Sequence, residues 1–510
     1  MSQGILPFQF KIEDGGKSLS AMAGLLVYLD LLLALKVRES VRSHVKASGE
    51  QGWMDEQILF ALVLLNIAGG DVVEDIEQLE RDGGLTALIQ KMETQGMSRQ
   101  QRRTFERRFR KGRERALPSI SAIRRYLEKF HDEEQEALRP EKGAFIPAAN
   151  AHLAGLEQVI ADVVAKVQSW VPQRTATLDM DATLDEVHKR TALFCYKHFR
   201  AYQPLNTWWA EHEMILHSEF RDGNVPAGYE QLRVLERSLE LLPAGVEEVY
   251  LRSDTAGYQW ELLKYCAEGK NARFGIIEFA VGCDVTPEFK VAVSSLSDEE
   301  WRPLISEKDG IKVDTGQEWA EVCFVPNEIG KSKNGPEYRF IATREPLRQK
   351  ELPGMEKKQE ELPFPTMDFG ESKERYKVFG LVSNRHDLPG DELILWLRER
   401  CGKSEEAHAV MKHDLAGGRL PSWNFGANAA WWGIMILSLN VNAAMKRLAL
   451  GGKYVRSRMK AIRYAFINVA GRLVRSGRRL FIQLPGCHAC MALLLRARER
   501  IFALAQAPPG

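Results

Sequence analysis

Three acidic residues in one short segment are the first candidates for chemistry. The segment "TLDMDATLDEVHKR", residues 177–190, contains Asp179, Asp181 and Asp185. On an extended strand, side chains two residues apart point to the same face, so the carboxylates of Asp179 and Asp181 would raise each other's pKa. A positive partner is therefore expected beside them. Two structural alternatives are that the strand ends in solvent, or that Asp185 caps a helix over "EVHKR".

A second acid occupies a similar setting. The stretch "VYLRSDTAGYQW" runs a hydrophobic strand into Asp254, just before a turn at Ala256 and Gly257 and a predicted helix. At the carboxyl edge of a sheet, adjacent strand ends lie about 5 Å apart. Two strand-end carboxylates can therefore converge on one divalent cation.

A third acid is then expected from a helix that crosses this edge. The stretch "GKSEEAHAVMKHDLAGGRLPSWNF" offers Glu405 and Glu406, and Lys412 lies two helical turns after Glu405 on the same face. Carboxylate oxygens favour Mg²⁺ or Mn²⁺ over Zn²⁺. Two such ions about 3.5–4 Å apart would activate a water or a 3′-hydroxyl and stabilise the leaving oxygen of a phosphodiester. Their charge would supply the positive partner that the acids require.

Composition indicates a soluble globular protein with segregated charge. The 510 residues are 45% hydrophobic and 27% charged, with a net charge of +1, which allows two to four domains. Apolar runs are too short for a membrane span, and the N-terminus does not resemble a secretory signal. Seven scattered cysteines suggest reduced thiols. We therefore expect a cytoplasmic protein without membrane contact.

Two strongly basic blocks suggest contact with DNA. Residues 99–115 hold nine Lys or Arg against two Glu, and residues 453–479 hold nine against no acid. Short helices around the first block are compatible with a helix-turn-helix reader of duplex DNA, although a basic solvated helix face would give the same pattern. The predicted DNA-binding residues are Arg102, Arg103, Arg107, Arg108, Arg110, Lys111, Arg124, Arg125, Arg456, Arg458, Lys460, Arg478 and Arg479.

Hydrophobic periodicity predicts an α/β protein with helical ends. Three-and-four spacing predicts helices over 18–95, and Pro118 and Ser119 mark another helix start. Strand-like runs follow at 175–181, 191–199, 213–220, 247–254 and 272–281, with helices at 227–243 and 257–269 between the later ones. Three strands followed by strand, helix and strand describe a mixed sheet with helices packed on it. Trp431 and Trp432 are expected in the core, because their spacing favours packing over base stacking.

Changes in composition suggest five segments. We expect a helical DNA-binding region at 1–170, the first part of a catalytic core at 171–283, a β-rich insertion at 284–375, the second part of the core at 376–448 and a basic helical C-terminal region at 449–510.

An ordered series of motifs resembles a known family. "TLDMDATLDEVHKR", "AYQPLN", "HSEFRDGNVPAG", "LRSDTAGYQWELLKYC" and "GRLPSWNFGANAAWWGIMILSLNVNAAMKR" are similar to DDE transposases of bacterial insertion sequences, in the group named after insertion sequence thirteen-eighty. That group is related to the larger cut-and-paste enzymes of the insertion-sequence-four type. The resemblance covers roughly residues 100–480. It implies a ribonuclease-H-like core, a DDE triad that holds two Mg²⁺ or Mn²⁺ ions, and movement of a DNA element.

The resemblance also implies roles for individual residues. The family's first acid falls on Asp181, with Asp179 as the alternative, and its second acid falls on Asp254. The related Tyr-Arg-Glu-Lys signature selects Glu405 and Lys412 over Glu406, although the expected Arg position holds Cys401. Partners would be double-stranded DNA, both the terminal inverted repeats and the target, bound by a homodimer.

Two alternatives to a transposase stay open. A metal-dependent nuclease would use the same acids without joining strands, and a catalytically silent DNA-binding regulator would use none of them.

Overall fold

The computed structural model of the chain describes residues 18–109, 112–308, 310–326, 335–347, 364–370, 374–400, 403–476, 479–486 and 490–506. Of these, residues 308, 403–405 and 479 are described by their backbone alone. The predicted DNA-binding residues Arg110, Lys111 and Arg478 lie outside this part of the chain.

The N-terminal region is helical, as the periodicity predicts. Ser98 and Ser119 cap two of its helices by accepting hydrogen bonds from the backbone N–H groups of Gln101 and Ala122. The second of these caps confirms the predicted helix start. The helices are α1 (Leu25–Ala34), α2 (Val37–His44), α3 (Asp55–Ala68), α4 (Ile76–Arg81), α5 (Gly83–Glu93), α6 (Arg99–Arg107), α7 (Ile120–Glu128) and α8 (Glu133–Ala137).

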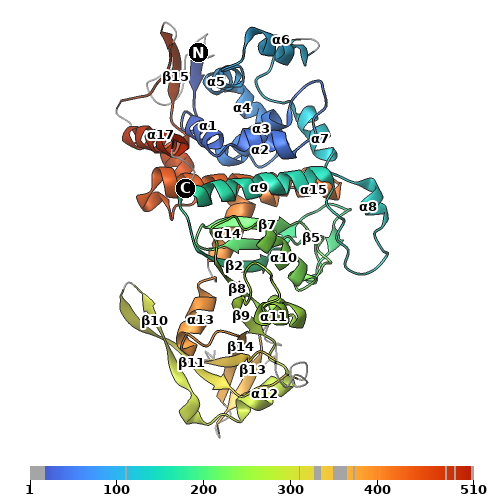
Figure 1. The fold of residues 1–510 in the computed structure, drawn as a ribbon, viewed down its shortest axis with the longest axis vertical. Coiled ribbons are helices and arrows are strands. Elements are labelled where there is room, and N and C mark those ends of the chain that lie inside the picture. The colour runs from blue at the N-terminus through green and yellow to red at the C-terminus, as the bar shows by residue number, and fades with distance from the viewer. Residues whose placement is uncertain are drawn as a thin grey trace, which may run out of the picture.

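A large mixed sheet forms the centre of the molecule (Figure 1). Along it the strands follow the order β10-β11-β12-β14-β9-β8-β2-β6-β7, and β13 pairs with β14. Strand β2 is antiparallel to β6 and parallel to β8, and β8 is parallel to β9. The central strands are β2 (Thr175–Ala182), β6 (Leu205–Trp209), β7 (Met214–Glu219), β8 (Glu248–Ser253) and β9 (Glu278–Cys283).

One of the three early strands was wrongly placed by the sequence. The aromatic run 191–199 contributes only β4 (Leu193–Phe194) to a small side sheet, where it pairs with β5 (Arg200–Tyr202). The central strand is β6 instead. The helix over "EVHKR" is also wrong, because Asp185–Glu186 forms β3 of the same side sheet.

Helices cover both faces of the sheet and one edge. On one face, α13 (Gly390–Arg398) packs Leu393 and Ile394 on Ala280 of β9. On the opposite face lie two predicted helices. The helices α10 (Gln231–Leu241) and α11 (Trp260–Ala267) confirm the two predicted ones, and Ser238 of α10 donates a hydrogen bond to Thr207 of β6. The long helices α9 (Ala151–Trp170) and α15 (Phe425–Ala444) lie between the sheet and the N-terminal helices (Figure 1). The side-chain amide of Asn440 pairs with both the N–H and the C=O of Ile215, so α15 covers the free edge of β7.

The segment between β9 and the second half of the core is rich in strands, as predicted. It extends the central sheet itself, because β14 pairs with β9 on one side and β12 on the other. Its elements are α12 (Pro287–Ser294), β10 (Arg302–Lys308), β11 (Ile311–Val322), β12 (Arg339–Pro346), β13 (Thr366–Phe369) and β14 (Glu374–Ser383), after which α13 (Gly390–Arg398) and α14 (Lys403–Ala409) return to helix.

The C-terminal region is only partly helical. Between α16 (Met459–Ile462) and α17 (Met491–Gln506) the chain forms a hairpin of β15 (Gly471–Ser476) and β16 (Arg479–Gln483). The short strand β1 (Leu19–Ser20) pairs with β15. The region expected to be helical therefore also contains strands, and residues 19–20 share one small sheet with residues 471–483.

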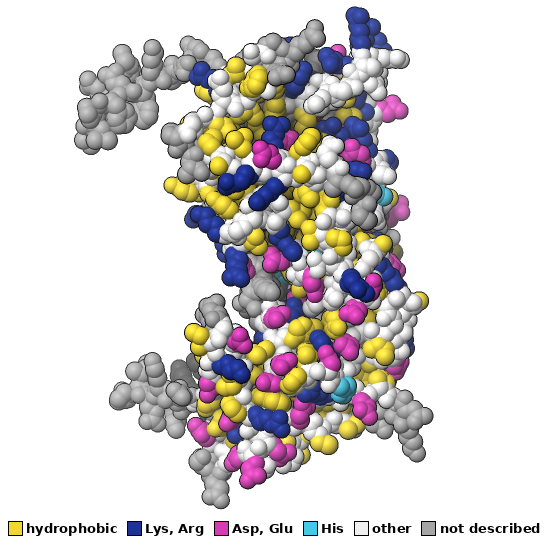
Figure 2. All heavy atoms as spheres, turned by 60° about the vertical axis from the view of Figure 1, so that its left-hand side comes forward, with side chains coloured by type: hydrophobic (Ala, Val, Ile, Leu, Met, Phe, Trp, Pro, Cys, Tyr) yellow, Lys and Arg dark blue, Asp and Glu magenta, His cyan; other side chains and the backbone are white. Residues whose placement is uncertain are grey.

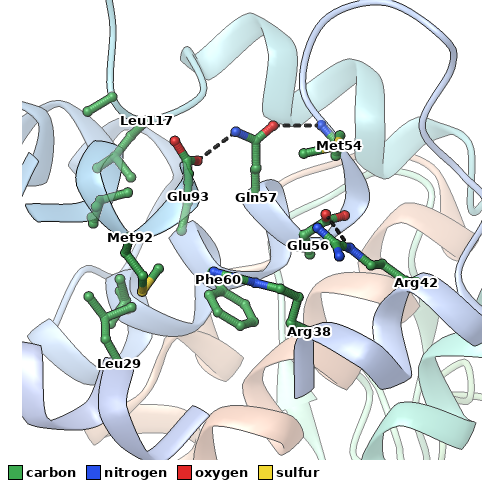
Figure 3. Close-up of a pocket in the computed structure, with 14 residues that line it drawn as sticks. Leu29, Arg38, Arg42, Met54, Glu56, Gln57, Phe60, Met92, Glu93 and Leu117 are labelled. Carbon is green, nitrogen blue, oxygen red and sulfur yellow. Dashed lines mark hydrogen bonds and ion pairs between the residues drawn. The ribbon is translucent and has the colours of Figure 1, made fainter. Parts of the chain in front are cut away.

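A large hydrophobic core joins most of these regions. It includes residues from Leu25 to Ile501, among them the fully buried Trp431 and Trp432, as predicted. A second, smaller core lies between α13 and the strands of the inserted segment and includes Trp319, Leu381 and Leu393. A cavity of about 30 Å³ remains among α1, α3 and α5, lined by Leu29, Phe60 and Met92 (Figure 3). That volume suits about one water molecule, so this cavity is a packing gap.

Among the described residues, one pair of consecutive helices, joined at a sharp bend, has the length and composition of a membrane span. No single helix in the described ranges has the length and apolar character to cross a bilayer. The helix α3 and the following segment Val73–Arg81 are long and apolar enough only when taken together, and a bend of 96° separates them.

Replacing Gly155 by Ala should destabilise the fold. A Cβ atom at this position of α9 would lie 2.2 Å from the carbonyl oxygen of His44 at the end of α2, so the backbone must shift. We expect the free energy of unfolding to fall by about 1–3 kcal/mol in urea titrations. Gly49→Ala is the control, because a Cβ there meets no atom within 4 Å. An equal loss in both variants would contradict the clash.

Candidate active site

Two adjacent parallel strands bring Asp181 and Asp254 to one edge of the sheet. Strands β2 and β8 pair in the register Asp179 with Arg252 and Met180 with Ser253. The next step of this register sets Asp181 beside Asp254 at the carboxyl ends of both strands. Because side chains alternate along a strand, all four charged residues share one face. The predicted convergence of two strand-end acids agrees with this arrangement.

The partner of Asp179 is an arginine in the neighbouring strand. Nε and Nη2 of Arg252 donate hydrogen bonds of 2.6 and 2.9 Å to the two carboxylate oxygens of Asp179. Both side chains are almost fully buried, with exposed fractions of 1% and 4%. This bidentate pair occupies both oxygens of Asp179. It therefore argues against the alternative in which Asp179 serves as the first metal ligand.

Arg252 also fixes the end of α13. Its Nη1 donates to the carbonyl oxygen of Trp396 at 2.8 Å and to the carboxylate of Glu399 at 3.0 Å. The chain leaving α13 then places Arg400 at Asp181, with Nη1 and Oδ2 separated by 3.0 Å. Arg400 is 9% exposed. The protein itself therefore supplies positive partners for both early acids.

Asp254 lies in a repulsive and partly buried setting. Burial raises the pKa of its carboxyl, and the nearby charge of Asp181 raises it further, while Arg400 opposes both effects. Its Oδ1 accepts a hydrogen bond of 3.0 Å from the N–H of Ala256, which caps the turn after β8. Asp181 and Asp254 are therefore close enough to interact electrostatically.

The helix α14 faces the same edge. Burial lowers the pKa of His408, and the charges of Lys412 and Arg400 lower it further. The carboxylate of Asp181 acts in the opposite direction. Burial also lowers the pKa of Lys412, against the opposing charges of Asp185 and Asp181. Lys412 lies in a π-helical turn, Val410–Asp414, and donates a hydrogen bond of 2.5 Å to the carbonyl oxygen of Leu184. Both side chains therefore lie within Coulombic range of Asp181.

The two candidate third acids are consecutive residues of α14. Position 405 is three residues before His408, a spacing at which two positions of a helix share a face. Glu406 is exposed. Burial lowers the pKa of Lys446, and the carboxylate of Glu406 opposes this effect. The hydrogen bond from Arg458 to Asp414 raises the pKa of Arg458, and Glu406 adds to it, so Glu406 lies within Coulombic range of both cations. The backbone direction of α14 thus favours Glu405 over Glu406.

The oxygen donors at this edge fit a hard divalent cation. Within the side chains that the structure describes, no group of three or more His, Cys, Asp and Glu is arranged to hold a metal ion, and the side chain of Glu405 is not among them. Asp181 and Asp254 supply carboxylates that repel each other and raise the pKa of Asp254. A divalent cation relieves such repulsion, and oxygen-only donors suit Mg²⁺ or Mn²⁺.

Asp185 is a buried acid beside this site. It is 3% exposed, and its Oδ2 lacks a hydrogen-bond partner among the described atoms. Burial raises its pKa to about 7, although Lys412 and Lys189 act in the opposite direction. Asp185 therefore changes its protonation near neutral pH.

The predicted DNA-binding residues divide into exposed and structurally bound groups. Arg102, Arg103 and Arg107 on α6 are exposed, as are Arg125, Arg456 and Lys460. Arg108 binds the carbonyl oxygens of Gly49 and Gly52, Arg124 pairs with Glu74, and Arg458 pairs with Asp414. Only the backbone of Arg479 is described. Part of each basic block thus stabilises the fold.

Comparison with protein families decides the relationship. The family model "Transposase DDE domain group 1" matches residues 8–506. The chain belongs to this DDE transposase family. No curated protein matches this transposase chain. Among solved structures, it is similar to the cryo-EM structure of the piggyBac transposase synaptic complex with hairpin DNA, with 11% identity and a TM-score of 0.43. That match covers 86% of this chain and 78% of the other.

Three residues at the candidate site of this transposase were not predicted from the sequence. Arg252 stands in the middle of a hydrophobic strand, and a charged residue in such a place signals a buried partner. Arg400 adjoins Cys401, which occupies the expected Arg position of the signature, and its pairing with Asp181 was not predicted. His408 could have been found from its position between Glu405 and Lys412 on one helix face.

Replacing Arg252 by Met should strongly destabilise the transposase. It leaves the buried carboxylate of Asp179 without a counter-charge, so the free energy of unfolding should fall by about 3–5 kcal/mol. The double variant Asp179→Asn/Arg252→Met should lose less than the sum of the single losses. Urea titrations measure all three.

Arg174→Met is the matched control for this prediction. Arg174 and Glu247 pair at the opposite ends of the same two strands, but they are 79% and 55% exposed. Such a pair contributes about 1 kcal/mol or less. Similar losses at Arg174 and Arg252 would show that burial of the Asp179 pair has no energetic consequence.

Asp185→Asn should flatten the pH dependence of stability. Because the pKa of Asp185 is about 7 in the fold and near 3.8 in the unfolded chain, the unfolded chain releases this proton first. Stability therefore falls as pH rises from about 4 to about 7. At pH 8 the variant should be more stable than the natural chain by about 1–3 kcal/mol. Urea titrations at pH 5 and pH 8, with exposed Asp284→Asn as control, test whether the gain is confined to high pH.

Proposed function

We propose that this chain binds the ends of an insertion sequence and catalyses DNA cleavage and strand transfer in cut-and-paste transposition. The observation that carries the proposal is the meeting of Asp181 and Asp254 at the ends of two parallel strands, within Coulombic range of His408 and Lys412 from the segment that begins with α14. Membership in the DDE transposase family makes these acids the candidates for the DDE triad. The finer assignment to the group of insertion sequence thirteen-eighty is part of this proposal.

The central strands support a ribonuclease-H-like core. Three successive antiparallel strands, β2, β6 and β7, lie on one side of the centre, and the parallel strands β8 and β9 lie on the other. In this proposal α10 and α11 flank the core, while β10–β13 form its insertion. The helix α9 joins the core to the N-terminal region, because it packs on α15 and β7 and also on α2.

Asp181, Asp254 and Glu405 would hold two Mg²⁺ or Mn²⁺ ions. Ions bound there would polarise a phosphodiester and lower the pKa of the attacking water or 3′-hydroxyl. Arg400 keeps the carboxylate of Asp181 oriented towards the site through its ion pair. Lys412 is the candidate phosphate clamp, since its ammonium is positioned at this edge by the carbonyl oxygen of Leu184.

DNA would be held by the exposed cations of the terminal regions. Arg102, Arg103 and Arg107 project from α6, and Arg456 and Lys460 project from the C-terminal region. On the face drawn in Figure 2, Lys and Arg side chains are spread over the upper half, and acidic side chains are more frequent over the lower half. A homodimer bound to two element ends, acting in the bacterial cytoplasm, completes the proposal.

Cleavage by point variants tests the three acids. The substrate is a duplex carrying the inverted repeats that flank the gene. Asp181→Asn, Asp254→Asn and Glu405→Gln should each lower the cleavage rate at least about 10²-fold and leave DNA affinity unchanged, because they remove groups that act on the reacting phosphate. Glu406→Gln is the matched control and should cleave normally. Loss of activity in Glu406→Gln with activity kept in Glu405→Gln would exchange their roles.

Two further measurements distinguish the alternatives. Transfer of a labelled 3′-end into supercoiled plasmid separates a transposase from a nuclease, which cuts without joining. Titration of the protein with Mn²⁺ in a calorimeter should show binding that Asp254→Asn abolishes. Unchanged cleavage and Mn²⁺ binding in this variant would refute the proposed site and favour a DNA-binding regulator.

A further inference from the structure

An exposed hairpin beside the candidate site carries aromatic rings into solvent. We define the aromatic hairpin as residues 188–200, which contain β4 and the start of β5. Phe194 is 56% exposed and Tyr196 is 69% exposed. Trp423, which is 59% exposed, lies next to the hairpin because its carbonyl oxygen accepts a hydrogen bond of 2.8 Å from Thr191. Burial in the core does not account for these three rings.

The hairpin is held in a defined shape although its tip is exposed. The N–H of Cys195 donates to the carbonyl oxygen of Phe199 at 2.9 Å, and His198 adopts the left-handed conformation with φ of 64°. At the base, Tyr202 is buried and stacks on Phe220 with ring centroids 4.8 Å apart. A non-glycine residue with positive φ costs free energy that the surrounding structure must offset. The exposed rings are therefore presented on a fixed support.

The charge of the hairpin complements a polyanion. From Val187 to Ala210 the chain contains no Asp or Glu. Arg190 and Lys197 are exposed at the hairpin, as are His188 and His198. Arg200 is partly used inside the hairpin, where it donates to the carbonyl oxygens of Arg190 and Ala192 and stacks on Phe194 at 4.5 Å. Aromatic rings between unopposed cations are the composition of nucleic-acid platforms.

The hairpin is next to the acids. It follows β2 in the chain, and Leu184, which precedes it, accepts the hydrogen bond from Lys412. The ammonium of Lys197 contributes to the lowered pKa of Lys412, which places the hairpin tip within Coulombic range of that residue. Lys412 in turn interacts with Asp181. The rings therefore stand beside the place where a DNA strand would be cut.

We propose that the aromatic hairpin binds the unpaired terminal base at a cleaved DNA end. Phe194 and Tyr196 stack on this base, and Arg190 and Lys197 hold the adjoining phosphates. A paired base is held in the duplex by its partner and its neighbours, so insertion between the two rings needs an unpaired nucleotide. The proposal rests on the proposed function, since it requires that this protein bind and cut DNA.

Equilibrium binding of labelled oligonucleotides tests the proposal. The probes are a continuous duplex and the same duplex ending in a short unpaired 3′ segment, with 2-aminopurine at the terminal base, in buffer without divalent cations. Phe194→Ala/Tyr196→Ala should weaken binding of the unpaired end about tenfold to a hundredfold and abolish the change in 2-aminopurine fluorescence. Binding of the continuous duplex should stay unchanged.

Two matched variants make the result specific. Phe502→Ala removes a ring that is 67% exposed on α17 and should bind both probes like the natural chain. Phe194→Tyr/Tyr196→Phe keeps both rings and should retain the preference for the unpaired end. Thermal unfolding of each variant shows whether it is folded.

Each contrary result has its own meaning. Equal losses on both probes, or no loss on either, would overturn the stacking proposal and assign the hairpin to duplex DNA or to a protein partner. Failure of the natural chain to bind either probe would overturn the proposed function together with this inference. Normal cleavage of duplex DNA by a hairpin variant that has lost its end preference would support the inference and leave the proposed function intact.

Discussion

The buried guanidinium of Arg252 is the contact on which the arrangement of the acids depends. It joins β8 to β2 through Asp179 and joins both strands to the end of α13 through Trp396 and Glu399. The residues that come next along these elements are Asp254, Asp181 and Arg400, respectively two, two and one positions further. Removing two charges from water is costly, and a well-packed apolar pair would often be as stable. The ion pair is better understood as a device for geometry, because its forked hydrogen bonds fix three chain segments at one point.

The electrostatics of the sheet edge follow from this geometry. Asp181 and Asp254 repel each other, and the protein offsets their charge with Arg400 and, more distantly, Lys412. The negative charges of Asp181 and Asp254 are thus largely offset by these cations before any metal ion binds. The positive partner expected for the early acids is therefore partly the protein's own arginines, whereas the sequence had suggested metal alone. Under the proposed function, an ion bound there would act on acids that are already oriented, and little rearrangement of the chain would be required.

The sequence predicted what depends on local patterns. Helical periodicity located the N-terminal helices, and the rule that parallel strand ends meet at one edge brought Asp181 to Asp254. It misplaced β6, because the aromatic run 191–199 has stronger strand propensity than Leu205–Trp209, and propensity does not distinguish a core strand from an exposed hairpin. It also could not find Arg400 at Asp181 or the bound arginines of the basic blocks. Those pairs join residues far apart in the chain, and no local pattern records them.

Long-range pairing also determines which basic side chains stabilise the fold and which are available to bind DNA. Affinity for DNA depends on the number of phosphates contacted and on the counterions released, not on net charge. A chain with a net charge of +1 can therefore bind DNA where its charges are segregated. Arg108, Arg124 and Arg458 are engaged by carbonyl oxygens or acids, so they are less available to phosphates than the exposed cations of α6, of the aromatic hairpin and of the C-terminal region. Under the proposed function, the acids of the lower half in Figure 2 would repel the same polyanion, and a DNA end would thus be guided towards the middle of the molecule, where β2 and β8 end.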